Sequence, residues 1–322
     1  MTHKPPAAAI LVVPLVVALV LTVFAWPSSR LEPRDLPVGV AGPAPAADAI
    51  EAKLAQRAGA FHVERYADES AARDAIEERE VYGAFVATPD GPKVLTGSAA
   101  SPVVAQLLSH AASEQNAEVE DVVSTPKAGG ALGSSVLPMV LAGIITGALA
   151  ALAGSTGAAR AGLVLAGSVL GGLSATLVVD TRLGVVEGDW LANAGVLTLT
   201  VLAIASAMAG LYALLGKHGL GLGAVLMILV GNPFSAAAAA PELLPEPVGG
   251  IGQLMPPGAG ANLLRSTGFF DGAGAGEHFA VLAVWALAGL AALALAEARR
   301  HSWNSHLRRV IVISDAPAGR RG

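Results

Sequence analysis

The chain contains 322 residues, of which 53% are hydrophobic and only 14% are charged, and its net charge at pH 7 is −5. About a quarter of the residues in a soluble domain are charged, so this composition excludes a wholly soluble protein and indicates a membrane protein. Cysteine is absent, which excludes a disulfide framework, a thiolate nucleophile and a thiolate metal site.

The N-terminal segment, residues 1–29, is predicted to be a membrane anchor that contains the first transmembrane helix. Residues 7–26 carry no charge, and a helix of this length crosses about 30 Å of hydrocarbon. A cleaved signal peptide is the alternative. We favour an uncleaved anchor, because the apolar run exceeds the usual length in signal peptides and no small-x-small cleavage site precedes Trp26-Pro27.

Residues 30–130 have the composition of an ordinary soluble domain with an acidic surface. Between residues 30 and 127 there are sixteen Asp and Glu residues against nine Lys and Arg residues. Strand and helix patterns alternate along this segment, which predicts an α/β domain with a largely parallel sheet. The predicted strands span residues 36–40, 61–66, 81–87 and 93–96, and the predicted helices span residues 46–58, 69–79 and 102–117.

Residues 131–296 are predicted to form a transmembrane domain of five helices. These helices span residues 136–154, 161–181, 194–216, 220–240 and 279–296. Together with the anchor they make an α-helical polytopic membrane protein with six transmembrane helices, and the α/β domain is inserted between helices 1 and 2. Residues 297–322 form a basic tail.

The basic residues predict the orientation of these helices. With the N-terminus inside, the inner segments contain nine Lys and Arg residues against Glu297 and Asp315, whereas the outer segments contain eleven against twenty-three Asp and Glu residues. Basic residues near span ends favour the cytoplasmic side. We therefore expect a multi-pass protein of a bacterial plasma membrane with both termini in the cytoplasm. The α/β domain and the loop of residues 241–277 then lie outside.

The most unusual stretch surrounds the end of the fifth helix. Asn232-Pro233 interrupts an apolar run, and a proline there removes a backbone donor and kinks or breaks the helix. Apolar character resumes from Ser235 to Ala240 and stops at Pro241-Glu242. The following loop consists of short apolar pieces separated by proline and glycine. This pattern predicts backbone that re-enters the membrane under protein cover.

No motif in the chain predicts catalysis, a cofactor site or a metal site. The seven histidines lack the spacing of a metal-binding helix face. The segment from Gly210 to His218 has five residues where a phosphate loop has four, and His218 stands in place of the required Ser or Thr. The predicted spans contain no Lys, Arg, Glu or His, which disfavours an ion-coupled carrier.

Two pairs of glycines, Gly143 with Gly147 and Gly167 with Gly171, lie one helical turn apart in the second and third predicted spans. Small residues at this spacing let helix backbones approach closely. The pattern therefore predicts that both pairs lie at helix–helix contacts.

Several segments together resemble the permease subunits of ABC transporter type 2 exporters, in the branch related to bacterial phage-infection proteins. They are Gly231-Asn232-Pro233-Phe234-Ser235, Ala240-Pro241-Glu242-Leu243-Leu244-Pro245, Gly252-Gln253-Leu254-Met255-Pro256-Pro257-Gly258, Asn262-Leu263-Leu264-Arg265 and, in the α/β domain, Val81-Tyr82-Gly83-Ala84-Phe85-Val86.

This resemblance implies that two short outer helices re-enter the membrane and close a lateral pathway. It also implies a dimer with an identical or different permease, and a separate cytoplasmic ATP-binding subunit. The chain departs from the family in one respect: only residues 155–160 lie where the family has a coupling helix between the second and third spans.

We therefore expect a permease-like subunit that moves an amphiphilic, lipid-linked or hydrophobic substrate outward, with no enzymatic activity of its own and no nucleic-acid partner. The alternative is a non-transporting surface protein whose outer domain binds a phage, a wall component or a partner protein. The expected gate residues are Asn232, Pro233, Ser235, Pro241, Glu242, Pro256, Pro257, Asn262 and Arg265, and the expected cytoplasmic partner contacts are Arg160 and Lys217.

Overall fold

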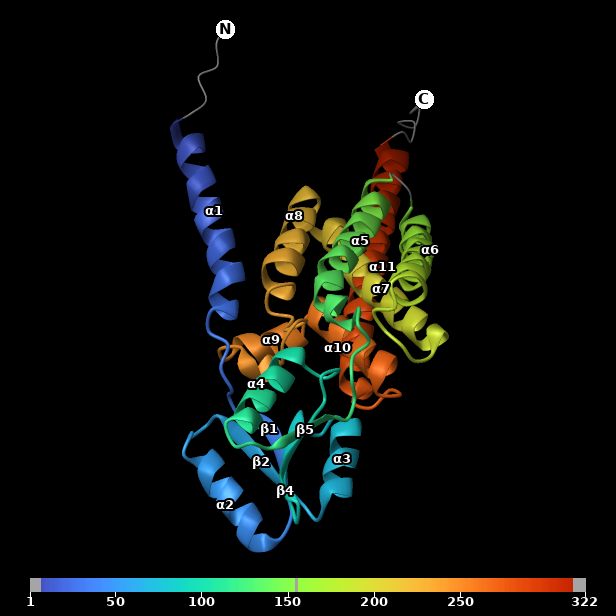
Figure 1. The fold of residues 1–322 in the computed structure, drawn as a ribbon. Coiled ribbons are helices and arrows are strands. Elements are labelled where there is room, and N and C mark those ends of the chain that lie inside the picture. The colour runs from blue at the N-terminus through green and yellow to red at the C-terminus, as the bar shows by residue number, and fades with distance from the viewer. Residues whose placement is uncertain (1–6, 154–155, 315–322) are drawn as a thin grey trace, which may run out of the picture.

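The computed structural model describes the backbone of residues 7–153 and 156–314, and the side chains of residues 12–153 and 156–299. A bundle of helices forms one end of the molecule, and a small sheet with its own helices forms the other (Figure 1). We call residues 36–121 the sheet domain. In the sequence it lies between the first and second long helices.

The sheet is mixed and has the strand order β2-β1-β3-β4-β5. Three of its four pairings are parallel, and only β3 and β4 form an antiparallel pair. Four of the strands match the sequence prediction closely. The strands are β1 (Leu36–Ala41), β2 (Phe61–Tyr66), β3 (Gly83–Thr88), β4 (Gly91–Thr96) and β5 (Glu118–Asp121).

Three helices cover the sheet. Helices α2 (Ala44–Ala55) and α4 (Pro102–Ser113) pack on one face, where Leu36, Val38 and Phe85 join the apolar side of α4. Helix α3 (Glu69–Glu77) covers the other face with Ala72, Ala75 and Ile76. The amphipathic pattern of α3 follows from burying this small apolar stripe against the sheet.

Four segments of the described chain are helices long and apolar enough to cross a membrane. They are Gly129–Leu152, which contains α5 (Leu132–Leu152), Gly157–Arg182, which contains α6 (Gly157–Thr176), Trp190–Leu215, which is α7, and Ala275–Arg299, the part of α11 (Ala275–Ser314) whose side chains are described. Two shorter apolar helices, Val12–Ser28 in α1 (Ala7–Ser28) and Lys217–Gly231, correspond to the other two predicted spans.

Helix α7 occupies the centre of the bundle and packs against α5, α6 and α11. Gly143 and Gly147 both face it, as the sequence predicts: a Cβ on Gly143 would lie 2.6 Å from Cβ of Ile204, and one on Gly147 would lie 2.5 Å from the carbonyl oxygen of Ala205. The pair in α6 also lies at helix–helix contacts: a Cβ on Gly167 would lie 2.7 Å from Cγ2 of Thr146 in α5, and one on Gly171 would lie 3.6 Å from Cγ1 of Val201 in α7. Its neighbour Gly172 makes a closer approach, to the backbone of Thr198 in α7.

We expect Gly147→Ala to destabilise the bundle by about 1–3 kcal/mol, because the added methyl group overlaps the backbone of α7. Gly162→Ala is the matched control, since a Cβ at Gly162 in α6 meets no atom within 4 Å. Thermal unfolding of the two variants in one detergent measures the difference. Equal melting temperatures would contradict this packing.

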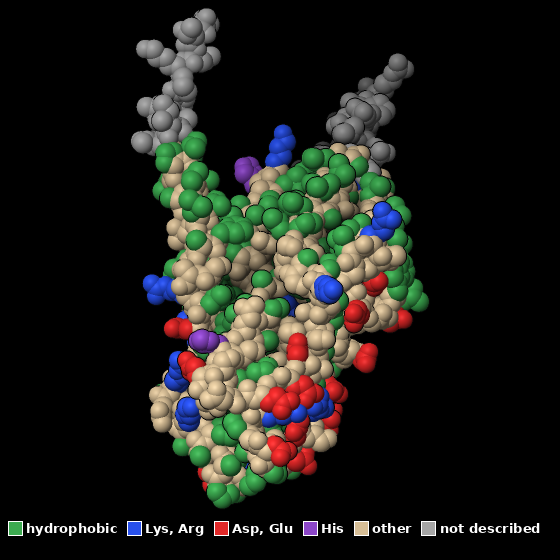
Figure 2. All heavy atoms as spheres, in the orientation of Figure 1, with side chains coloured by type: hydrophobic (Ala, Val, Ile, Leu, Met, Phe, Trp, Pro, Cys, Tyr) green, Lys and Arg blue, Asp and Glu red, His purple; other side chains and the backbone are tan. Residues whose placement is uncertain are grey.

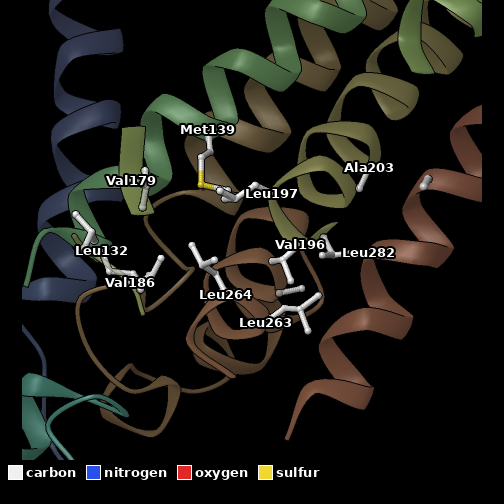
Figure 3. Close-up of a cluster of buried hydrophobic side chains, with 13 residues drawn as sticks. Leu132, Met139, Val179, Val186, Val196, Leu197, Ala203, Leu263, Leu264 and Leu282 are labelled. Carbon is white, nitrogen blue, oxygen red and sulfur yellow. The ribbon is translucent and has the colours of Figure 1, made fainter. Parts of the chain in front are cut away.

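A buried apolar cluster shows that the long loop before α11 is part of the bundle (Figure 3). Leu197 and Val196 of α7 share this cluster with Leu263 and Leu264, which belong to that loop, and with Leu282 of α11. The loop side chains are nearly inaccessible to solvent. Burying them against three elements fixes the loop in one position.

Candidate functional site

The helix that begins at Lys217 ends at Gly231, at the predicted break. Helix α8 (Lys217–Val225) continues as a π-helical turn, Leu226–Gly231, and Pro233 follows. Residues 232–240 are not helical, so the prediction of one span over residues 220–240 is wrong. The chain turns away instead, and the Ser235 hydroxyl donates to the Asn232 carbonyl oxygen at 2.7 Å. Pro233 favours this stop, because it has no N–H to donate to a carbonyl oxygen one turn earlier.

The loop after the break contains two helices, α9 (Val248–Gln253) and α10 (Pro256–Phe269). Pro256 and Pro257 start α10, where their missing N–H groups cost nothing. Glycines allow the loop to fold tightly on itself. A Cβ on Gly252 would lie 1.6 Å from the carbonyl oxygen of Phe234, so α9 lies directly against the chain that follows the break.

Asn262 of α10 is the centre of a polar network inside this loop. Its amide nitrogen donates to Gln253 Oε1 at 2.6 Å, and its Oδ1 accepts from Arg265 Nη1 at 3.0 Å. Gln253 Nε2 in turn donates to the Ser235 carbonyl oxygen at 3.1 Å. Arg265 is 3% exposed, and its Nη2 donates to the Ala237 carbonyl oxygen at 2.8 Å. The network thus connects both loop helices to the helix break.

Arg79 extends the same network into the sheet domain. It follows the C-terminus of α3 with a φ of 63°, and its Nη2 donates to Asn262 Oδ1 at 3.2 Å. Its Nη1 donates to the Asn262 carbonyl oxygen at 3.1 Å and to the Ser266 hydroxyl. The guanidinium lies 5.3 Å from the centre of the Phe270 ring. A single side chain of the sheet domain therefore satisfies several acceptors on α10.

Tyr82 of the sheet domain and Arg34, which lies just before β1, make a second set of contacts with the start of the loop. The Tyr82 hydroxyl donates to Glu242 Oε2 at 2.9 Å, and Arg34 Nη1 donates to the Leu243 carbonyl oxygen at 2.8 Å. Ala239, Ala240 and Leu243 also belong to the same buried apolar cluster as the strands β1 and β3. The start of the loop is consequently part of the hydrophobic core of the sheet domain.

The charges of this network are unbalanced. Neither Arg79 nor Arg265 forms an ion pair with a carboxylate among the side chains that the structure describes. Burial lowers the pKa of Arg79, and the negative charge of Glu242 opposes that shift. Burial, and then Glu242, raises the pKa of Tyr82. Burying two cations beside one carboxylate costs desolvation free energy that the single ion does not fully offset.

A cavity of about 600 Å³ opens beside the network, between the sheet domain, the loop and the start of α11. Ten of its lining residues are polar or charged: Arg34, Asp35, Arg79, Tyr82, Glu242, Glu246, Gln253, Asn262, Glu277 and His278. Nδ1 of His278 is buried and has no hydrogen-bond partner in the described part of the chain. The cavity has the size of a small-ligand site, and its walls come from segments that are distant in the sequence.

The structure brings several predicted gate residues together. Ser235, Glu242, Asn262 and Arg265 belong to the contacts above, whereas Asn232 takes part through its carbonyl oxygen. Pro233, Pro241, Pro256 and Pro257 shape the backbone of the same loop.

The two predicted partner contacts lie at the end of the bundle away from the sheet domain (Figure 1). Lys217 is exposed at the start of α8. Arg160 is only 7% exposed, and its guanidinium lies 5.9 Å from the centre of the Tyr212 ring. A partner would therefore contact the turn around Arg160 rather than its charge.

Sequence reasoning did not assign Arg79, Tyr82 or Gln253 to the site. Arg79 lies in a charged segment typical of a solvated helix end, and its acceptors are 183 residues away or more. Only the fold brings these groups together. No protein family, curated protein or solved structure matches the chain in the comparisons made.

Proposed function

We propose that the chain is a permease-like subunit of an ABC-type exporter that moves an amphiphilic, lipid-linked or hydrophobic substrate outward. The observation that carries the proposal is the network of Arg79, Asn262 and Arg265, which joins the sheet domain to a loop that follows a broken helix. Irregular backbone at membrane depth requires cover by protein. In this proposal the loop is the outer gate, and the sheet domain supplies that cover.

Six spans are part of the proposal. Helix α1 has 22 residues, which corresponds to about 33 Å at 1.5 Å per residue and suffices to cross the hydrocarbon. Lys217–Gly231 is shorter, at 15 residues, so the loop would complete the fifth crossing. The termini then lie in the cytoplasm of a bacterial cell and the sheet domain lies outside.

The lateral side of the bundle supports an amphiphilic cargo. Helix α1 lies at the edge of the bundle in Figure 1 and contacts the π-helical turn Leu226–Gly231. Its large apolar side chains such as Val13, Leu15 and Leu21 are 60–70% exposed. No Lys, Arg or Glu lies in the central parts of the long helices. Such a surface favours a molecule that enters from the lipid.

The partners in this proposal are a second permease, identical or different, and a separate cytoplasmic ATP-binding subunit. The latter would bind at the end of the bundle that contains the Arg160 turn and the exposed Lys217. ATP hydrolysis would power export at that end of the bundle, and the substrate would be released at the opposite end. The lipid bilayer surrounds the long helices.

Affinity purification from native membranes tests this proposal. We expect an ATP-binding protein to co-purify with the full chain and to be lost with a Lys217→Glu, His218→Glu variant, because both residues are exposed at the proposed contact. Arg182→Glu, which reverses an exposed charge at the other end of the bundle, is the matched control and should retain the partner. If no ATP-binding protein co-purified with the unsubstituted chain or with either variant, the proposal would be contradicted.

A non-transporting surface protein is the second candidate. The size of the sheet domain and its acidic surface (Figure 2) favour it as a binding module. A chain that brings down no ATP-binding protein and whose deletion changes neither efflux nor membrane lipids would support this function instead.

A further inference from the structure

A groove on the sheet domain lies apart from the gate network. It has a volume of about 510 Å³ and lies between α2 and α4 on one face of the sheet. Phe61 and Phe85 form its floor, Leu54 of α2 forms one wall, and Leu107 and Ala111 of α4 form the other. None of these five residues contributes to the contacts of Arg79 or Arg265.

The groove exists because the two helices cover different strands. The apolar side chains of α4 contact Val94 and Phe85, whereas Ile50 and Leu54 of α2 lie at the edge of the same apolar cluster. Phe85 remains 9% exposed at the bottom of the space between them. An apolar hollow of this size on a folded domain is typical of a ligand site.

The charges at the mouth of the groove are opposite in sign to those of the domain as a whole. Residues 30–127 contain sixteen acidic and nine basic residues, yet the groove is lined by Lys53, Arg57 and Lys93 and by one carboxylate, Glu114. Glu114 lies 3.8 Å from His110. An acidic domain thus presents a cationic mouth at this apolar hollow.

Two of these cations are unpaired, in contrast to others of the same domain. Arg65 binds Asp48 and Glu51, while Arg73 and Lys93 both bind Glu69 and Glu120. Lys53 and Arg57 form no ion pair with any carboxylate among the described residues, and both are exposed at the C-terminal end of α2. They are available for an anion.

We propose that this groove binds a long-chain fatty acid. Its acyl chain lies between α2 and α4 over Phe61 and Phe85, and its carboxylate lies at Lys53 and Arg57. A single chain suits a hollow of this volume, and the planar guanidinium of Arg57 matches a carboxylate. The proposal does not depend on export, since the groove belongs to the sheet domain alone.

Photo-crosslinking tests this site in the full chain, reconstituted in discs of zwitterionic phosphatidylcholine. The probe is a palmitate analogue with a photoreactive group at the end of its acyl chain. We expect labelled peptides from residues 50–61 and 103–117, and competition by palmitate at lower concentration than by hexadecanol. Labelling confined to the transmembrane helices, or equal competition by the neutral alcohol, would overturn the proposal.

Three variants make the test specific. Ala111→Trp fills the groove and should abolish labelling. Lys53→Gln with Arg57→Gln leaves the apolar groove intact and should raise the palmitate concentration needed for competition by about tenfold, as expected for two exposed charge contacts. Lys127→Gln removes an exposed cation outside the groove and should change nothing. Unchanged labelling of Ala111→Trp would contradict the site. So would equal competition by palmitate in the double variant Lys53→Gln, Arg57→Gln and in the control Lys127→Gln.

Discussion

Gly252→Ala is expected to destabilise the protein by about 3 kcal/mol or more, the largest effect of any single methyl group in the loop. The added Cβ would lie 1.6 Å from the carbonyl oxygen of Phe234 and 2.4 Å from its carbonyl carbon. Both atoms belong to the backbone, so no side-chain rotation relieves the overlap. Helix α9 would have to leave its place against the helix break, and we expect a lower melting temperature and a poorer yield of monodisperse protein.

Gly250→Ala is the matched control, because it lies two residues away in the same helix and a Cβ there meets nothing within 4 Å. Alanine stabilises an exposed helical position by about 0.5–1 kcal/mol relative to glycine. We therefore expect no loss of stability from Gly250→Ala. If the two variants melted alike, α9 would not pack against the segment after Pro233.

Arg79→Ala is expected to cost about 2 kcal/mol and to loosen the sheet domain from the loop. The substitution removes the donors to Asn262 and Ser266 and the contact with Phe270. Loss of the partner of a buried acceptor costs about 1–3 kcal/mol for each group. Removal of a partly desolvated cation offsets some of that loss, which keeps the net value near 2 kcal/mol.

Arg73→Ala is the control for this variant, since Arg73 lies on α3 and pairs with Glu69 and Glu120 near the surface. Surface ion pairs contribute about 0–1 kcal/mol. Denaturant or thermal unfolding, together with limited proteolysis around residues 122–130, compares the two variants. A larger loss from Arg73→Ala than from Arg79→Ala would contradict the role assigned to Arg79.

Local patterns were sufficient to predict most of the sheet domain. The alternation of apolar residues from Phe61 to Tyr66 matches β2, and the apolar segment ending at Ala87 overlaps β3. Strand β5 (Glu118–Asp121) was missed because it is short, acidic and largely exposed. It exists through its pairing with β4, which no local pattern encodes.

The helix break at Asn232 was predictable because proline acts locally, within one turn of helix. The end of that helix was not, since the apolar residues up to Ala240 resemble a continued span. Ala239 and Ala240 instead enter the core of the sheet domain. An apolar run does not distinguish lipid from a protein core.

The polar residues of the loop were recognisable as unusual, because amides and an arginine within an apolar region need partners. Their partners were not predictable. Asn262 and Arg265 are three residues apart on one helix, but Arg79 reaches Asn262 from another region of the chain. Long-range contacts of this kind depend on the packing of the sheet domain onto the loop.

Labelling of single cysteines tests the central claim most directly, namely that the sheet domain and the loop network lie outside while the α7–α8 turn lies inside. The chain has no cysteine of its own, so Asp90→Cys and His218→Cys each create one exposed thiol. In intact spheroplasts treated with a membrane-impermeant maleimide, we expect labelling of the Asp90→Cys variant only. The His218→Cys variant should react after permeabilisation. Labelling of His218→Cys in intact spheroplasts, or protection of Asp90→Cys, would contradict the account.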